Sequence, residues 1–279
     1  MSALKEALKQ RLRQGETLSA LHPRAYPVAG WWQGGVNLNT PAPEGWPLPK
    51  EAAVIEGREG YRFSPENLTL AWALKGVRAR SVVDLGAGSG SLGLIAAWSV
   101  GAERLVSVER QAEQVSRLSR TFEGFSQASC VRAPRCEVLC ADLREPTLRA
   151  HVFERLEASS EAQEGAELVV LNPPFFPEGW GRASESLEVH ASTHSLHGDV
   201  GDFLACARAL LAPQGRIVVL YDAGRLADLL PALASTQLSL LSVHYTPETR
   251  TDRPPTPFRV WVSLGVHPQE GGARVYALE

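Results

Sequence analysis

The feature that most constrains the fold is a regular alternation of short apolar runs with helix-forming segments between residues 81 and 234. The apolar runs predict strands at 81–85, 104–109, 137–140, 168–171 and 216–221. The segments that follow them predict helices at 90–99, 111–122, 202–211 and 223–234. Such alternation predicts an α/β, Rossmann-like, doubly wound sheet that is mostly parallel.

Two further strands are predicted at 238–245 and 258–266. The loop between them is too short to hold a crossover helix, so we expect these last strands to be antiparallel. Ahead of the alternation we predict a helix at 64–76. Residues 1–60 are expected to form an N-terminal helix and a Pro- and Trp-rich arm, and residues 61–279 the main domain.

Composition sets the class of protein. The chain has 279 residues and a net charge of −3, which disfavours a protein held on nucleic acid by bulk charge, although a local basic patch remains open. Its four cysteines form no Cys-x-x-Cys pair, so we expect free thiols in a reducing compartment. No apolar run is long enough to span a bilayer. We therefore expect a cytoplasmic protein.

A glycine-rich turn follows the first predicted strand and precedes a helix, in the order Asp84-Leu85-Gly86-Ala87-Gly88-Ser89-Gly90. Glycines allow a sharp turn and a close approach of the backbone to a ligand. Asp84 suits a cationic amino-acid tail better than a pyrophosphate. Glu109 ends the second strand, where a carboxylate can accept both ribose hydroxyls. Asp142 follows the third strand and could meet an adenine amino group or, alternatively, cap a helix.

The tetrad Asn172-Pro173-Pro174-Phe175 follows the fourth strand. Two prolines end the strand and hold Asn172 in an extended conformation. If the Asn172 side-chain oxygen and the Pro173 carbonyl accept the two hydrogens of a planar amine, the nitrogen lone pair turns toward a methyl donor. Phe175 offers a flat face for stacking. These catalytic residues should lie beside the glycine turn, because ligands bind beyond the carboxyl ends of neighbouring strands.

In this order, the glycine turn, Glu109, Asp142 and the tetrad resemble class I S-adenosylmethionine-dependent methyltransferases of the amino-methylating kind. The resemblance implies S-adenosyl-L-methionine as the cofactor. The methyl transfer that it implies needs no metal. The segment from Tyr61 to Asn67 is similar to the one found upstream of the glycine turn in bacterial tRNA(Val) adenine-N6 methyltransferases. Through the resemblance, Phe63, Leu143 and Asn172 join the expected cofactor contacts, which otherwise are Asp84, Gly86, Gly88, Gly90, Glu109 and Asp142.

The same resemblance implies adenine N6 in tRNA as the acceptor. In that group a loop after the tetrad carries Arg, Thr and His residues, and here it holds His190, Thr193, His194 and His197. The ending at 258–262 also resembles the last strand of the family. The resemblance therefore implies a methyltransferase that modifies RNA and takes part in tRNA processing.

The charge near the tetrad keeps an alternative open. Between Phe175 and His190 there is one arginine, Arg182, against the three glutamates at 178, 185 and 188. A tRNA-binding mouth should be basic. The alternative acceptor is a protein glutamine or a small amine-bearing metabolite. A zinc site at the three histidines and a hydrolase are disfavoured, because acidic or Cys ligands and a Gly-x-Ser-x-Gly elbow are missing. A protein that only binds a cofactor or RNA would not need Asn172 poised on two prolines.

Overall fold

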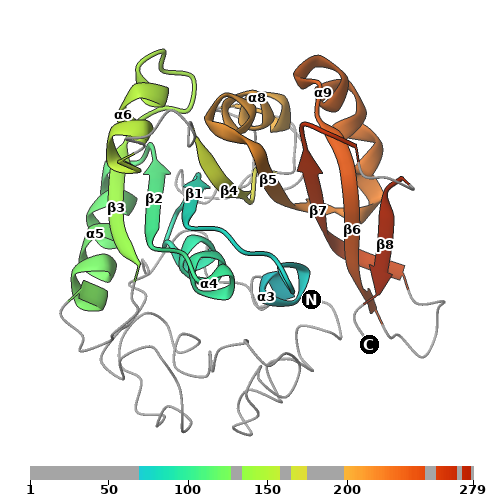
Figure 1. Cartoon of the computed structure of the whole chain (residues 1–279), viewed down its shortest axis with the longest axis horizontal. Helices are drawn as coiled ribbons and strands as arrows, with labels where there is room; N and C mark the ends of the chain where they lie inside the picture. The colour runs from blue at the N-terminus through green and yellow to red at the C-terminus, as the bar shows by residue number, and fades with distance from the viewer. Residues whose placement is uncertain are drawn as a thin grey trace, which may run out of the picture.

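The computed structural model describes residues 69–126, 134–157, 165–174, 198–248, 256–268 and 272–277. These residues build one eight-stranded sheet in the order β3-β2-β1-β4-β5-β7-β6-β8 (Figure 1). The strands are β1 (Ser81–Leu85), β2 (Arg104–Glu109), β3 (Arg135–Cys140), β4 (Ala166–Leu171), β5 (Leu211–Asp222), β6 (Ser239–Glu248), β7 (Thr256–Gly265) and β8 (Arg274–Ala277).

The mostly parallel sheet confirms the predicted fold class. Strands β3, β2, β1, β4 and β5 are parallel to one another, whereas β7 runs antiparallel to both β5 and β6. The predicted antiparallel pairing of the two strands β6 and β7 is therefore confirmed. One strand was not predicted: the short β8 pairs with β6 in parallel, so the antiparallel strand is β7 and not the last one.

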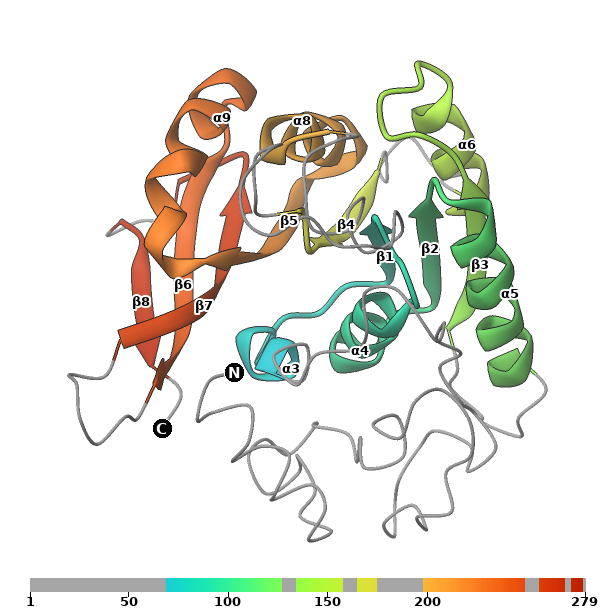
Figure 2. The same cartoon turned by 180° about the vertical axis from the view of Figure 1, so that it is seen from behind.

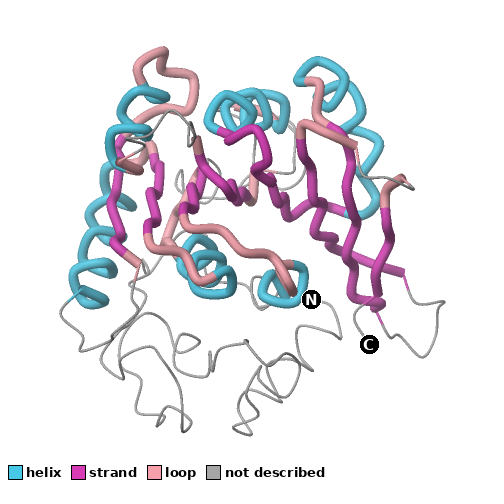
Figure 3. The backbone as a smooth tube through the Cα atoms, in the orientation of Figure 1, coloured by secondary structure: helices cyan, strands magenta, loops and turns pink. Residues whose placement is uncertain are grey.

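Helices cover both faces of the sheet (Figures 2 and 3). They are α3 (Leu70–Ala73), α4 (Ser91–Val100), α5 (Ala112–Ser126), α6 (Leu148–Arg155), α8 (Val200–Leu210), the 3-10 helix η2 (Ala223–Asp228) and α9 (Leu229–Thr236). One core lies between the sheet and α3, α4 and α5; the other lies under α6, α8 and α9. The molecule is thus a three-layer α/β sandwich around the sheet.

Successive residues of the central strands enter opposite cores. Val82 lies in the first core and Val83 in the second, and Leu168 and Val169 of β4 divide in the same way. All four are fully buried, as expected for strands covered on both faces, and each contributes roughly 1.5–3 kcal/mol by burial. The same alternation turns Asp84, Glu109 and Asn172 toward the face that α3 and α4 cover.

Two helical predictions differ in detail from the structure, and one helix was not predicted. The helix predicted at 64–76 is represented among the described residues by α3. The helix predicted at 223–234 is divided into η2 and α9, because Arg225 has non-helical backbone angles and the Asp222 side chain accepts a hydrogen bond from Gly224 N at 2.9 Å. Helix α6 was not predicted at all. No described helix is long and apolar enough to cross a membrane.

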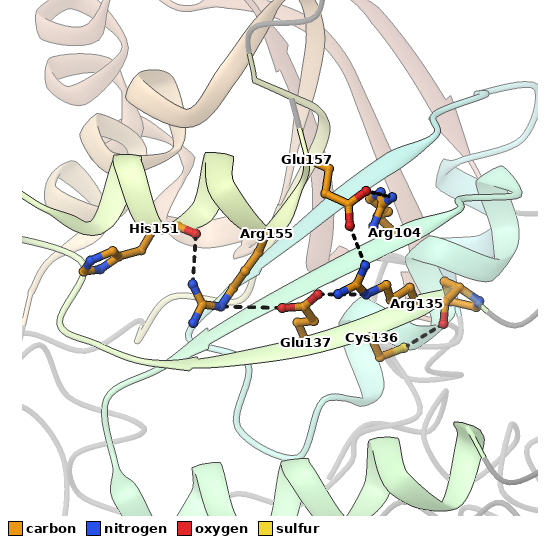
Figure 4. Close-up of polar contacts among 8 residues, drawn as sticks. Arg104, Arg135, Cys136, Glu137, His151, Arg155 and Glu157 are labelled. Carbon is orange, nitrogen blue, oxygen red and sulfur yellow. Dashed lines mark hydrogen bonds and ion pairs between the residues drawn. The ribbon is translucent and has the colours of Figure 1, made fainter. Parts of the chain in front are cut away.

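Ion pairs gather at the edge of the sheet where β2 and β3 begin (Figure 4). Glu157 bridges Arg104 and Arg135, the first residues of those strands. Glu137 of β3 accepts from Arg135 Nε at 3.0 Å and pairs with Arg155 of α6 at 3.6 Å. These residues are partly exposed, and such pairs each contribute about 0–1 kcal/mol. This network occupies the amino-terminal edge and leaves the opposite edge to the predicted ligand site.

Candidate active site

The predicted ligand edge is formed where β1 and β4 end side by side. The two strands pair in parallel from Val82↔Leu168 to Leu85↔Leu171. The glycine turn leaves β1 at this point, and Asn172 leaves β4 directly beside it. The predicted adjacency of the first and fourth strands is therefore confirmed, and it brings the two principal motifs together (Figure 1).

The glycine turn is held against the end of β2 by its backbone. Gly86 N and Ala87 N both donate to Val108 O, at 2.9 and 3.0 Å. Gly86, Gly88 and Gly90 all have positive φ, which other residues rarely adopt. A Cβ on Gly90 would lie 2.2 Å from Leu118 Cδ1, whereas a Cβ on Gly88 would meet nothing within 4 Å. Gly90 therefore serves packing, whereas the space beside Gly88 is open.

Glu109 is oriented by two backbone amides. Gly88 N donates to Oε2 at 3.0 Å and Gln111 N donates to Oε1 at 2.8 Å. The residue is only 7% exposed. Each carboxylate oxygen has a second lone pair, so the group can accept two further hydrogen bonds from one diol. This geometry fits the ribose contact that was predicted for Glu109.

Asp84 lies beneath the glycine turn, with 1% of its surface exposed. Its Oδ2 accepts a hydrogen bond from Gly93 N of α4 at 2.9 Å, which satisfies an amide in the first turn of the helix. Its Oδ1 is buried and accepts no hydrogen bond from any of the described residues. Burial raises the pKa of Asp84 to about 7; the Gly93 hydrogen bond opposes this rise and the charge of Glu109 adds to it.

An unpartnered, buried carboxylate oxygen suits a cationic or N–H donor. It fits the amino-acid tail of S-adenosylmethionine, as predicted from the acidic character of the residue, although contact with that tail stays a prediction. The described residues at this edge thus fit the cofactor at three points: an acid with an unpartnered oxygen at Asp84, open space beside Gly88 and a pre-oriented acceptor at Glu109.

Asp142 closes a tight turn after β3. Arg144 N donates to its Oδ1 at 3.0 Å, and Asp142 N donates to Glu145 Oε1 at 2.9 Å. Helix α6 begins only at Leu148 and has Thr147 as its N-cap, so the alternative role of Asp142 as a helix cap is wrong. The Arg144 side chain holds the pKa of Asp142 at about 2 through its hydrogen bonds. Leu143 is half-buried and packs on the second core.

Asn172, Pro173 and Pro174 leave the sheet as predicted, because β4 ends at Leu171. The Asn172 side-chain oxygen is buried. Phe175, the last member of the tetrad, lies outside the described residues, and so do Phe63 and the loop residues His190, Thr193, His194 and His197. Within the described part of the chain, no group of three or more His, Cys, Asp or Glu residues could hold a metal ion.

Sequence reasoning missed three contributors to this edge. The backbone amide of Gln111 orients Glu109, and Arg144 binds Asp142. Asp222, at the end of β5, forms a partly buried ion pair with Arg259 of β7, its partner across the two strands. A signal existed for Asp222, since a polar residue directly after a buried strand is the pattern that revealed Glu109 and Asp142.

Together the described residues form a Rossmann-like α/β domain with a glycine turn after β1, an acid at the end of β2 and Asn-Pro-Pro after β4. The chain is similar to proteins named tRNA1(Val) (adenine(37)-N6)-methyltransferase, which confirms the predicted resemblance. The relative from Shewanella halifaxensis is 27% identical over 184 residues, 66% of this chain and 66% of that protein. Those from Shewanella pealeana and Cronobacter sakazakii are 28% and 29% identical, over 58% and 60% of this chain and 59% and 60% of their own lengths.

The matched region thus covers less than two thirds of the length of these relatives. No protein-family model matches the chain. Similar solved structures include a predicted O-methyltransferase from Agrobacterium tumefaciens, with 20% identity and a TM-score of 0.49 over 75% of this chain and 83% of that one. Another is a ribosomal protein L11 methylase from Lactobacillus delbrueckii, with 13% identity and a TM-score of 0.45 over 76% and 84%.

Proposed function

We propose that this chain is an enzyme that transfers a methyl group from S-adenosyl-L-methionine to the N6 amino group of an adenine in tRNA. The observation that carries the proposal is the pairing of β1 with β4, which sets Asn172 beside the glycine turn. Donor and acceptor would then meet across two adjacent strand ends. The relatives named as tRNA adenine-N6 methyltransferases support the choice of acceptor.

The donor, when bound, supplies a methyl group on a positively charged sulfur. The chain's own residues orient the two reactants. Glu109 would accept the ribose hydroxyls, and Asp84 Oδ1 would accept from the amino-acid tail. Asn172 Oδ1 and the Pro173 carbonyl would accept the two amine hydrogens, which directs the nitrogen lone pair at the methyl carbon.

The donor would supply its methyl group to the oriented nitrogen and leave as S-adenosylhomocysteine, and the methylated nitrogen would then release one proton to solvent. The reaction needs no strong base, because the amine loses its proton only after it has acquired a positive charge. Catalysis by Asn172 is therefore orientation and charge stabilisation.

The decisive experiment is Asn172→Ala. We expect methyl transfer to fall by about 10³-fold, because a positioned hydrogen-bond acceptor is lost at the reacting nitrogen. Binding of S-adenosylhomocysteine, measured by calorimetry, should stay within about threefold of the wild type. Asn172→Asp keeps an acceptor in place and serves as the matched variant, with a smaller loss expected. Undiminished turnover in Asn172→Ala would contradict the mechanism.

A second candidate acceptor is a protein glutamine or a small amine-bearing metabolite, favoured by the three glutamates at 178, 185 and 188 beyond the tetrad. Labelled methyl donor incubated with tRNA extracted from cells that lack this protein separates the two. Incorporation into tRNA supports adenine N6. Absence of label in any RNA, together with label in a protein or metabolite fraction, supports the second candidate.

A further inference from the structure

The turn that follows β3 is closed by hydrogen bonds within four residues. Asp142 N donates to Glu145 Oε1 at 2.9 Å, Glu145 N donates to Asp142 O at 3.0 Å, and Arg144 N donates to Asp142 Oδ1 at 3.0 Å. These bonds fix the backbone of Asp142 and place one of its carboxylate oxygens. The second oxygen depends on a side chain.

That side chain is Arg144. Its Nε donates to Asp142 Oδ1 at 2.9 Å and its Nη2 donates to Oδ2 at 2.8 Å, which is the two-pronged geometry that a guanidinium forms with a carboxylate. Such a fork fixes both the position and the plane of the carboxylate. The Asp142 side chain is 20% exposed and that of Arg144 is 52% exposed.

Stability alone does not account for this pair. An ion pair between partly exposed side chains contributes little to folding, because solvent screens it. The position of Asp142 at the edge of the sheet indicates another role for the pair. Glu109 ends β2 and Asp142 follows β3, and these strands pair up to Glu109↔Cys140, so the two carboxylates lie at the same edge of the sheet on neighbouring strands. Oδ1 already accepts two hydrogen bonds from Arg144, whereas Oδ2 accepts one and keeps a lone pair for a further donor.

The charge of Asp202 also acts on Arg144. Asp202 is already engaged at the start of α8, where it accepts from Asp199 N at 3.1 Å and its own amide donates to Asp199 Oδ1 at 3.0 Å. The guanidinium is thus drawn chiefly to Asp142 and stays in the fork.

We propose that Arg144 is a positioning residue that holds the Asp142 carboxylate in the orientation that reads the amino group of the donor's adenine. The inference rests on the proposed function, because it takes the adenine of S-adenosylmethionine as the ligand of Asp142. Arg144 acts through Asp142 and does not itself contact the ring. Its removal should therefore affect recognition of the amino group and spare the rest of the donor.

The test compares two ligands by calorimetry: S-adenosylhomocysteine, and S-inosylhomocysteine, in which a carbonyl oxygen replaces the adenine amino group. The wild type should bind the adenine form at least about tenfold more tightly, as expected for a hydrogen bond to a charged acceptor. In Arg144→Ala, affinity for the adenine form should fall about tenfold while affinity for the inosine form stays unchanged. Arg144→Lys, which cannot form the fork, should lie between.

Arg110→Ala is the matched control. Arg110 is exposed and its charge also acts on Asp142, but at longer range. Its loss removes one positive charge and leaves the fork, so the ratio of the two affinities should not change. Thermal melting should show all three variants folded.

Each other outcome has a distinct meaning. If the wild type binds both ligands equally, or if the affinity ratio survives in Arg144→Ala, the inference is wrong while donor binding stands. Tighter binding of the adenine form by Arg144→Ala would show that Arg144 competes with the ring, which also overturns the inference. If the wild type binds neither ligand, the proposed function fails, and this inference fails with it.

Discussion

Two acidic residues on neighbouring strands accept different numbers of hydrogen bonds from the surrounding backbone. Glu109 receives two amide hydrogens, whereas Asp84 receives one and keeps a buried oxygen that no described residue satisfies. A buried acid that is only half satisfied destabilises the folded chain, and such groups concentrate at functional sites. We therefore expect the charged Asp84 side chain to lower the stability of the folded chain while it favours ligand binding.

The variant Asp84→Asn tests this opposition through pH. The pKa of Asp84 is raised from 3.8 to about 7 on folding, so the folded protein holds a proton that the unfolded chain has lost. Its contribution to stability is therefore full below pH 3.8 and is lost as pH rises through about 7. Asn cannot titrate, so between about pH 5 and pH 8 the wild type should lose about 2 kcal/mol more than the variant.

Urea denaturation at the same two pH values, followed by tryptophan fluorescence, measures the difference. Identical pH dependence in the two proteins would show that Asp84 does not carry the shifted proton. At the higher pH the variant should also bind S-adenosylhomocysteine more weakly, since an amide is a poorer acceptor for a cationic tail than a carboxylate.

Sequence reasoning identified the candidate acceptors Glu109 and Asn172, but not the groups that orient the candidate site's carboxylates. Both could be proposed from the sequence because parallel strands bring their carboxyl ends to one edge of the sheet. The contacts made by the Arg144 side chain and the Gln111 amide depend on a turn conformation and on side-chain rotamers. The neighbouring residues in the sequence do not specify these. The Asp222–Arg259 pair needed the register between β5 and β7, which joins residues 37 positions apart.

Among the helices and strands, those with a strong pattern of apolar residues could be predicted from the sequence, and those with a weak pattern could not. The central strands were found because they are continuous apolar runs, buried on both faces. Helix α6 buries only Leu148 and Val152, so its periodicity is faint. Strand β8 has four residues, of which Val275 and Tyr276 are exposed, and it carries no apolar signal. Its place in the sheet comes from pairing with β6.

Helix α4 offers a matched pair of glycines at its two ends. Gly90, the N-cap, and Gly101, the C-cap, both have left-handed backbone angles, but only at Gly90 would a Cβ collide, at 2.2 Å from Leu118 Cδ1. Gly101→Ala should cost about 1 kcal/mol for backbone strain alone. Gly90→Ala should cost about 1–3 kcal/mol more, because Leu118 must move within a filled core.

Urea denaturation of both variants measures the two costs. Equal losses would mean that Leu118 relaxes freely, and the packing role of Gly90 would then be wrong. Because Gly90 begins the helix that carries Gly93, its substitution should also disturb the Asp84–Gly93 hydrogen bond and weaken donor binding. Gly101→Ala should leave donor binding unchanged.

At the scale of the whole molecule, the two edges of the sheet have different tasks. The amino-terminal edge carries the Arg104–Glu157–Arg135 ion pairs (Figure 4), and the carboxyl-terminal edge carries Asp84, Glu109 and Asn172, near the ends of β1, β2 and β4. Stabilising contacts and ligand-binding groups are thereby separated along the strands. A buried contact joins the beginning of the described chain to the far side of the sheet: Trp261 Nε1 of β7 donates to Thr69 Oγ1 at 2.7 Å.

This contact closes the first core across 192 residues and anchors the chain at the start of the described domain. Thr69 is the N-cap of α3, yet its hydroxyl caps no helical amide and instead accepts from the indole. Thr69→Val conserves shape and leaves a buried N–H without an acceptor, which should cost about 1–3 kcal/mol in free energy of unfolding. Thr69→Ser retains the oxygen and should cost less than about 1 kcal/mol.

A double-mutant cycle isolates the bond. Trp261→Phe removes the donor, so in its background Thr69→Val should cost much less than in the wild type. The two substitutions would then be non-additive by the energy of the hydrogen bond, about 1 kcal/mol. Additive costs, or equal stability of Thr69→Val and Thr69→Ser, would mean that the indole finds another acceptor and that side-chain packing alone holds β7 to the start of the domain.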